Sequence, residues 1–297
     1  MHVFVTGASG HIGSAVVDEL LEAGHSVTGL ARSDESAAAL AAKGVNVRRG
    51  DLDDLDALRD GAAASDGVIH LAFRHDFDDF VGAAATDLRA VQAMGEALVG
   101  SDRPFVSTCG TLILAFVAPG TLATEQDTLE AGPRIDSENF VIGLGERGVR
   151  SSVVRLSPLV HSNLDHHGFT HILINGAREA GKSVYIGDGA NRWPAVHTLD
   201  AAHLYRLALE NAPAGTRLHG VADEGVPFRD IAGVIGRHLD VPTVGVSTEE
   251  AAHLGFLAGF APLDNPTSSA LTQKVVDWHP ERPGLIEDLD AGHYFGE

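Results

Sequence analysis

The chain has 297 residues, of which 44% are hydrophobic and 21% are charged, and its formal net charge at pH 7 is −20. These values are typical of a globular enzyme with a large core, and the negative charge argues against binding to the phosphate backbone of a nucleic acid. The single cysteine, Cys109, excludes an intrachain disulfide and is typical of a reducing compartment.

Two features predict a soluble, cytoplasmic protein. The longest apolar run, Leu112 to Ala118, is far too short to span a bilayer. A glycine-rich stretch begins at Gly7, which leaves no room for a secretory segment before it. We therefore expect a small-molecule substrate, and neither a nucleic acid nor a membrane as a partner.

The first 24 residues predict a strand, a glycine turn and a helix. An apolar run at His2–Val5 is followed by the turn, and apolar positions then recur at helical spacing from Ser14 to Ala23. The free N–H groups and the dipole of a helix N-terminus favour a phosphate. We therefore predict a dinucleotide site whose pyrophosphate lies against the turn, lined by Gly7, Ser9, Gly10, His11, Ile12 and Gly13.

The next segments alternate between strands and helices. Strands are predicted at residues 25–30, 45–47, 68–72, 104–108 and 152–156, and helices at 37–43, 52–61 and 77–99. This alternation predicts a parallel, doubly wound sheet of the α/β class, with a dinucleotide-binding Rossmann core over residues 1–157.

The pattern changes after residue 157. Residues 157–168 are predicted to form a polar, histidine-rich loop, followed by helices at 169–180, 201–211, 228–239 and 248–260 and a strand at 183–186. Asp200 is expected to cap the helix at 201–211. We expect residues 158–297 to form mainly a smaller substrate-side cap, with parts that return to the core.

The glycine spacing resembles that of the short-chain dehydrogenase/reductase superfamily, in its extended and atypical members (the NAD-dependent epimerase/dehydratase-like group). Gly187-Asp188-Gly189, Trp193 and Val196 to Asp200 match a second segment of that group, on the substrate side. The resemblance implies a nicotinamide dinucleotide cofactor. It also implies cofactor contacts from Asp51 and Leu52 after the third strand, and from Leu71, Ala72 and Phe73 after the fourth.

The end of the second strand indicates which cofactor is used. A carboxylate there binds the ribose hydroxyl of NAD, whereas an arginine neutralises the 2′-phosphate of NADP. Arg32 and Ser33 occupy this place, and the first acid is Asp34. The sequence therefore favours NADP; NAD remains possible if Arg32 is a solvated loop charge and Asp34 binds the ribose.

The usual catalytic pair of the superfamily, Tyr-x-x-x-Lys, is missing. None of the three tyrosines begins such a motif, and counting back from the sixth strand places Arg134 and Glu138 at the Tyr and Lys positions. Arginine does not donate a proton at neutral pH, so the superfamily's mechanism cannot be transferred.

Other polar groups are candidates for the chemistry. The superfamily's active hydroxyl aligns best with Cys109, between Thr108 and Thr111, although a small buried side chain is the simpler interpretation of Cys109. His161 begins a polar loop that also contains Asp165, His166 and His167 and leads to His171. These side chains could be polar groups of the substrate pocket or belong to a surface loop. A metal site is a third interpretation. We predict no metal.

Three functions fit the sequence. The first is NADPH-dependent reduction of a small carbonyl or imine-like substrate with a non-standard proton donor. The second is a catalytically silent NADP-binding redox sensor or regulator, and the third a nucleotide-sugar epimerase or dehydratase. The resemblance also implies a homodimer, because many relatives pair through helices like those at 77–99 and near Ser137 across a two-fold axis.

Overall fold

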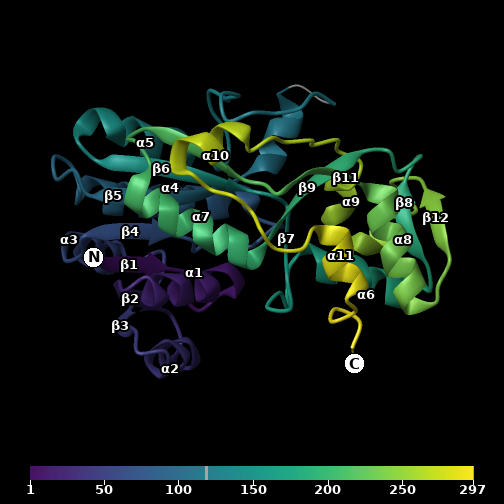
Figure 1. Cartoon of the computed structure of the whole chain (residues 1–297), viewed down its shortest axis with the longest axis horizontal. Coiled ribbons are helices and arrows are strands. Elements are labelled where there is room, and N and C mark those ends of the chain that lie inside the picture. The colour runs from purple at the N-terminus through teal and green to yellow at the C-terminus, as the bar shows by residue number, and fades with distance from the viewer. Residues whose placement is uncertain (118–119, 297) are drawn as a thin grey trace.

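The computed structural model describes residues 1–117 and 120–296, so Ala118, the last residue of the apolar run, lies outside the described residues. Within these residues, seven strands form one parallel sheet in the order β10-β6-β5-β4-β1-β2-β3 (Figure 1). The strands are β1 (His2–Thr6), β2 (Ser26–Ala31), β3 (Asn46–Arg49), β4 (Gly67–His70), β5 (Pro104–Gly110), β6 (Arg150–Leu156) and β10 (Thr216–Gly220). The strand order reverses between β1 and β4, which is where such sheets bind their ligands.

Helices cover both faces of this sheet because successive side chains of a strand point to opposite sides. Val3 and Val5 of β1 share one core with residues of α1 and α7, whereas Phe4 joins a second core with α3 and α4. The flanking helices are α1 (His11–Glu22), α2 (Asp34–Ala42), α3 (Leu55–Ala63), α4 (Phe80–Glu96), α5 (Ile135–Gly143), α7 (Thr198–Asn211) and α10 (Ala270–Val276). The α/β class and the doubly wound parallel sheet are confirmed.

The remaining elements lie on the right of Figure 1, around a third core that includes Trp193 and Phe228. In the described part of the chain they include a three-stranded sheet, a two-stranded sheet and several helices. They are β7 (Leu159–His161), β8 (Ser183–Ile186), β9 (Arg192–His197), β11 (Asp223–Pro227), β12 (Thr243–Val246), α6 (Phe169–Ala180), α8 (Phe228–Leu239), α9 (Leu257–Phe260) and α11 (Leu285–Asp290). The described residues also contain three 3₁₀ helices, η1 (Thr111–Phe116), η2 (Leu144–Arg147) and η3 (Ala252–Leu254).

Three local predictions are wrong. The helix expected at 248–260 is divided into η3 and α9 by Gly255, whose φ of +60° is incompatible with a helix. The loop expected at 157–168 contains β7, which pairs in parallel with β9. Asp200 does not cap α7: His197 Nδ1 accepts the capping bond from the Leu199 N–H at 3.2 Å, and Asp200 accepts N–H groups of residues 281 and 282.

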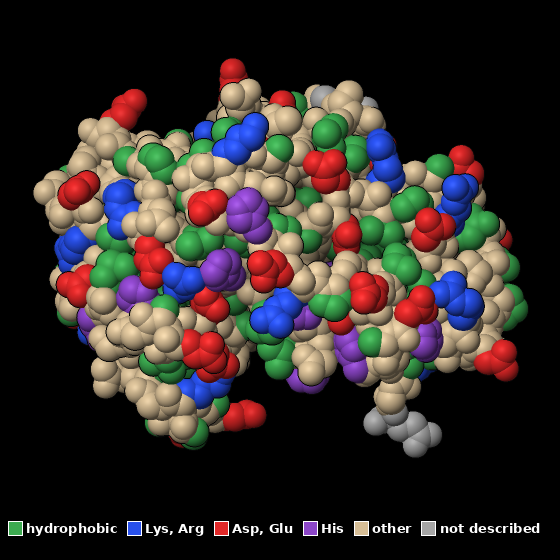
Figure 2. All heavy atoms as spheres, in the orientation of Figure 1, with side chains coloured by type: hydrophobic (Ala, Val, Ile, Leu, Met, Phe, Trp, Pro, Cys, Tyr) green, Lys and Arg blue, Asp and Glu red, His purple; other side chains and the backbone are tan. Residues whose placement is uncertain are grey.

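The surface carries charges of both signs. On the face shown in Figure 2, acidic and basic side chains are interspersed over the whole molecule, and the lower outline is hollowed between the amino-terminal elements and the C-terminal ones. Within residues 1–117 and 120–296, no helix combines the length and the apolar character needed to cross a membrane.

Candidate functional site

The glycine turn after β1 requires glycine at two positions. Gly7 has a φ of +69°, and a Cβ atom there would lie 2.7 Å from the backbone nitrogen of Ala72. A Cβ on Gly13 would lie 2.0 Å from the carbonyl oxygen of Gly7. The turn therefore packs directly against the end of β4 and the start of α1, as a close backbone approach to a pyrophosphate requires.

The N-terminus of α1 is open to an anion. Gly10 is its N-cap residue, and among the described residues no side chain caps it. Ser9 and Gly10 are exposed, and a Cβ on Gly10 would have one neighbour within 4 Å, the Gly7 carbonyl oxygen at 3.3 Å. Because uncapped N–H groups at a helix start favour negative charge, the residues present fit the pyrophosphate of a dinucleotide.

The carboxyl ends of β2 and β3 carry a basic corner. Arg32 is exposed and forms no ion pair within the part of the chain that the structure describes. Asp34 is held by Arg49, whose Nη2 lies 2.7 Å from Asp34 Oδ1, and Arg49 Nη1 donates to the Ser33 carbonyl at 2.5 Å. The Ser33 hydroxyl accepts the Ser36 N–H, so it also caps α2.

The other predicted cofactor residues lie at the same edge of the sheet. Asp51 Oδ1 accepts the N–H groups of Asp53 and Asp54 and so shapes the turn after β3, while Leu52 is buried in the core beside it. Leu71, Ala72 and Phe73 follow β4 and are half-buried. All of these residues therefore lie at the edge of the sheet where the sequence predicts the cofactor to bind.

Arg134 lies at the N-terminus of α5 and is fixed by several neighbours. Its backbone has a φ of +68°, which is unusual for a residue with a side chain. Its Nη2 donates to the Thr108 carbonyl at 2.5 Å, its guanidinium carbon lies 4.0 Å from the ring centre of Phe73, and its Nη1 is 3.7 Å from Asp87 Oδ1. The side chain is 12% exposed. A permanent cation, held by these contacts, therefore lies at the place that the sequence predicts for the tyrosine.

A buried series of polar contacts connects the guanidinium of Arg134 to the end of β1, just before the glycine turn. The side chain of Asp87 is 2% exposed, and Asp87 Oδ1 lies 3.2 Å from His70 Nε2; His70 Nδ1 is 2.7 Å from the hydroxyl of Thr6. Burial alone would raise the pKa of Asp87, but the charge of Arg134 and the contact with His70 hold it below its ordinary value. Asp87 is therefore ionised beside Arg134.

Glu138 lies in a separate buried ion cluster. Its carboxylate accepts from Arg155 Nη2 at 2.5 Å, from Arg155 Nε at 2.9 Å and from Arg217 Nε at 2.6 Å. Burial opposes ionisation, yet these two arginines hold the pKa of Glu138 below its ordinary value. The carboxylate at the lysine position thus fastens α5 to β6 and β10, away from the contacts of Arg134.

The three residues predicted around the active hydroxyl are each hydrogen-bonded to other residues or buried in the core. The Thr108 hydroxyl donates to the His70 carbonyl at 2.8 Å and accepts from the Tyr205 hydroxyl at 2.7 Å. Burial raises the pKa of Cys109 to about 12, so its thiol stays protonated at neutral pH. The buried Thr111 hydroxyl accepts from Asn265 Nδ2 at 3.2 Å.

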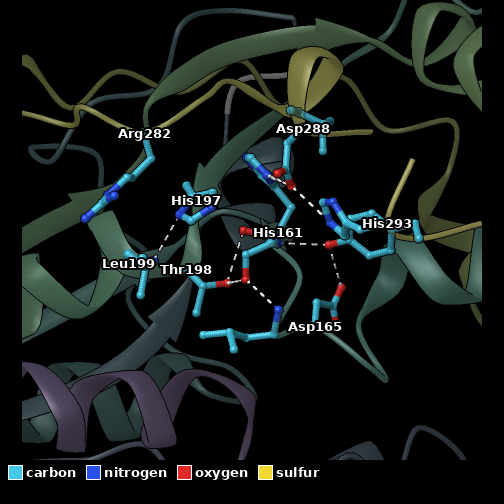
Figure 3. Close-up of polar contacts among 12 residues, drawn as sticks. His161, Asp165, His197, Thr198, Leu199, Arg282, Asp288 and His293 are labelled. Carbon is cyan, nitrogen blue, oxygen red and sulfur yellow. Dashed lines mark hydrogen bonds and ion pairs between the residues drawn. The ribbon is translucent and has the colours of Figure 1, made fainter. Parts of the chain in front are cut away.

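His161 is buried on β7 and paired with Asp288 of α11 (Figure 3). The distance from His161 Nδ1 to Asp288 Oδ2 is 2.8 Å, and His161 Nε2 has no hydrogen-bond partner among the described residues. Its ring meets that of His197 edge to face, with centres 5.5 Å apart. Within residues 1–117 and 120–296, no three histidine, cysteine or acidic side chains are placed to hold a metal ion.

Hydrogen bonds connect this region to the glycine turn. The Thr198 hydroxyl donates to the His161 carbonyl at 3.1 Å and accepts from the Ser162 hydroxyl at 2.8 Å (Figure 3). It also lies 2.7 Å from His11 Nε2. Burial lowers the pKa of His11, so its ring is neutral and donates its Nε2–H to Thr198. A residue of the predicted pyrophosphate turn is thus tied to the start of α7.

Several residues at the site escaped the sequence reasoning, above all Asp87 and its partner His70. The spacing of α4 contains a signal for the first, because Asp87 falls on the same helical face as the buried Ala83, Ala90 and Met94. A charged side chain on a buried face needs a partner, but the identity of its partners depends on how α4 packs against β4 and α5.

The chain has relatives that match its whole length. Residues 3–101 match the NAD dependent epimerase/dehydratase family. An uncharacterized protein of Schizosaccharomyces pombe is 48% identical over 298 residues, covering 99% of this chain and 100% of the relative. The chain is 28% identical to 2′-dehydrokanamycin reductase of Streptomyces kanamyceticus, covering 96% of this chain and 81% of that protein.

Solved structures show the same fold at low identity. dTDP-glucose 4,6-dehydratase from Streptomyces venezuelae, solved with NAD bound, superimposes with a TM-score of 0.76 at 18% identity. The superposition covers 99% of this chain and 96% of that one.

Proposed function

Since this chain is a member of the NAD-dependent epimerase/dehydratase family, within the short-chain dehydrogenase/reductase superfamily, we propose that it is an enzyme that reduces a small carbonyl or imine-like substrate with NADPH. One observation carries the proposal: Arg134 stands at the tyrosine position and contacts Phe73, one residue from the Ala72 backbone on which the Gly7 turn packs. A cation in contact with Phe73 would lie close to a nicotinamide ring bound beyond β4. The similarity to 2′-dehydrokanamycin reductase supports a reductase.

The preference for NADP rests on the basic corner at β2 and β3. Asp34, the acid that would bind the ribose of NAD, is already paired with Arg49. Arg32 is exposed at the end of β2 and forms no ion pair among the described residues, so its guanidinium can bind a 2′-phosphate. A bound NADPH supplies the hydride for the reduction.

We assign the binding of the substrate to Arg134, and neither Thr108 nor Cys109 is placed to supply the proton. Arg134 stays charged at any ordinary pH, so it orients the substrate oxygen and stabilises negative charge that develops there. The Thr108 hydroxyl donates its proton to the His70 carbonyl, and the Cys109 thiol is buried. We therefore assign the final proton to water.

The test is NADPH consumption with a panel of ketones, aldehydes and imines, followed by the loss of reduced-nicotinamide absorbance. Turnover with at least one class is the expected result. Tight NADPH binding without turnover across the panel would contradict the proposal.

That outcome would favour the second candidate, an NADP-binding redox sensor or regulator. The observation behind this candidate is the same substitution: Arg134 and Glu138 occupy the places of the proton-transfer pair, while the glycine turn is intact. Ligand binding without chemistry needs no proton donor.

A further inference from the structure

The guanidinium of Arg134 retains donors for a ligand. An arginine carries five N–H groups. In residues 1–117 and 120–296 its hydrogen bond to Thr108 occupies one of them, and a second nitrogen faces Asp87 at the distance of an ion pair. The remaining N–H groups, including that of Nε, have no hydrogen-bond partner there. Because the side chain is 12% exposed, a ligand oxygen would find a fixed and largely desolvated cation.

The position of Arg134 is imposed by the surrounding structure. Its left-handed backbone is a conformation that persists where neighbours hold it, and such outliers concentrate at functional sites. The Thr6–His70–Asp87 chain ends at the guanidinium, and the guanidinium carbon lies 4.0 Å from the ring centre of Phe73. These contacts orient the cation before any ligand arrives.

An arginine in place of the tyrosine changes which product anion the site can stabilise. Hydride addition to an isolated ketone forms an alkoxide, a strong base that needs a proton as it forms; a tyrosine supplies that proton. Hydride addition to the far end of a conjugated carbonyl forms an enolate or a phenolate instead, which is a much weaker base. A fixed cation is sufficient for such an anion, because charge stabilisation replaces immediate proton transfer.

The surroundings of Arg134 favour a flat, conjugated molecule. From Phe73 a series of ring contacts leads through Phe80 and Phe77 to Phe256, whose ring stacks on that of Phe77 with centres 3.6 Å apart. Phe169 of α6 contacts Phe77 and Phe256. Aromatic faces stack well on planar π systems.

We propose that Arg134 is the oxyanion-binding catalytic residue of a conjugate reduction, and that the substrate is an aromatic enone. The inference rests on the proposed function and specifies its substrate class. A hydride from the reduced nicotinamide forms a C–H bond at the β-carbon, the C=C π pair moves to make the enolate, and the nicotinamide is oxidised. Arg134 holds the enolate oxygen, and water then gives a proton to the α-carbon.

A matched pair of substrates tests where the hydride goes. The enone 4-phenyl-3-buten-2-one and the saturated ketone 4-phenyl-2-butanone are each supplied with NADPH deuterated at the transferred position. We expect the enone alone to be consumed, with deuterium on its β-carbon by NMR. Deuterium on the carbinol carbon, or equal turnover of the saturated ketone, would overturn the inference while leaving the proposed function intact. No consumption of these or of any simple carbonyl or imine would defeat both.

A binding measurement tests Arg134 without turnover. At a pH below the pKa of free 4-nitrophenol, protein saturated with NADP⁺ is expected to bind it as the yellow phenolate and raise its visible absorbance. Arg134→Met should weaken this binding at least tenfold and abolish the colour change, and Arg134→Lys should retain part of both. Arg147→Met, an exposed arginine that precedes β6 at the opposite end of the sheet, is the matched control. An unchanged phenolate signal in folded Arg134→Met protein would refute the assignment.

Discussion

Arg32 is the residue that decides between the two cofactors in this account. Removing its charge by Arg32→Ala should weaken NADPH binding by about tenfold or more, because charge-assisted hydrogen bonds to a phosphate are among the stronger polar contacts. NADH binding should change little, since NADH lacks the 2′-phosphate. Fluorescence titration of both cofactors measures the difference.

The matched control is Arg59→Ala, an exposed arginine of α3 that pairs with Asp56. It should leave both affinities unchanged. If Arg32→Ala weakened NADH and NADPH equally, Arg32 would have no role in the choice of cofactor.

Individual residues also show how far sequence reasoning reaches. The glycines at 7 and 13 were predictable because each position excludes a side chain, and that requirement is local. The pairing of Arg134 with Asp87 was not predictable, because the two residues are 47 positions apart and meet only where α4 packs on α5. Likewise His161 meets Asp288 from 127 positions away.

At the scale of elements, the Glu138 cluster fastens α5 to β6 and β10. Glu138→Gln should lower the free energy of unfolding by about 3 kcal/mol, because it leaves the buried Arg155 and its neighbour Arg217 without a counter-charge. Urea denaturation measures this change.

The comparison variant is Glu96→Gln, which breaks an exposed ion pair with Arg147. It should have little measurable effect, since exposed pairs are screened by solvent. Equal stability of the two variants would show that the buried cluster does not fasten these elements.

Elements with a clear period were predicted well. The helices expected at 169–180 and 228–239 occur with those bounds, since their apolar residues recur at helical spacing and glycine or aspartate ends them in the left-handed conformation. The helix expected at 248–260 failed at Gly255, whose positive φ redirects the chain. β7 was missed because a strand of three residues carries almost no periodic signal.

For the whole molecule, His219 predicts how stability depends on pH. Burial, together with the guanidinium of Arg155 that donates to Nε2 at 3.4 Å, lowers the pKa of His219 to about 4. Between pH 6.5 and 4 the unfolded chain therefore binds this proton and the folded chain does not. The contribution of His219 to the free energy of unfolding is fully present above pH 6.5. It is lost as the pH is lowered toward 4, with a slope of about 1.4 kcal/mol per pH unit for one proton.

Urea denaturation across this pH range checks the slope. His219→Gln should flatten it, whereas His279→Gln, which replaces an exposed histidine paired with Asp277, should not. An unaltered slope in the His219 variant would mean that other groups bind the protons.

We also propose that two copies of the chain pair through α4 and α5. Val81 of α4 is 69% exposed, so burying it in a dimer would remove apolar surface from water. Sedimentation velocity should give twice the mass of the chain. Val81→Glu should shift the protein toward the monomer, and Leu271→Glu on α10 should not; a monomeric parent protein would contradict the dimer.

We propose that NADPH binds at the N-terminus of α1 and that an arginine, not a phenol, binds the reacting oxygen of the substrate. A crystal structure of the complex with NADP⁺ and 4-nitrophenolate tests both parts at once. We expect the pyrophosphate on the glycine turn, the 2′-phosphate beside Arg32, and the phenolate oxygen on the guanidinium of Arg134. An empty turn, or a tyrosine hydroxyl in contact with the phenolate, would contradict it.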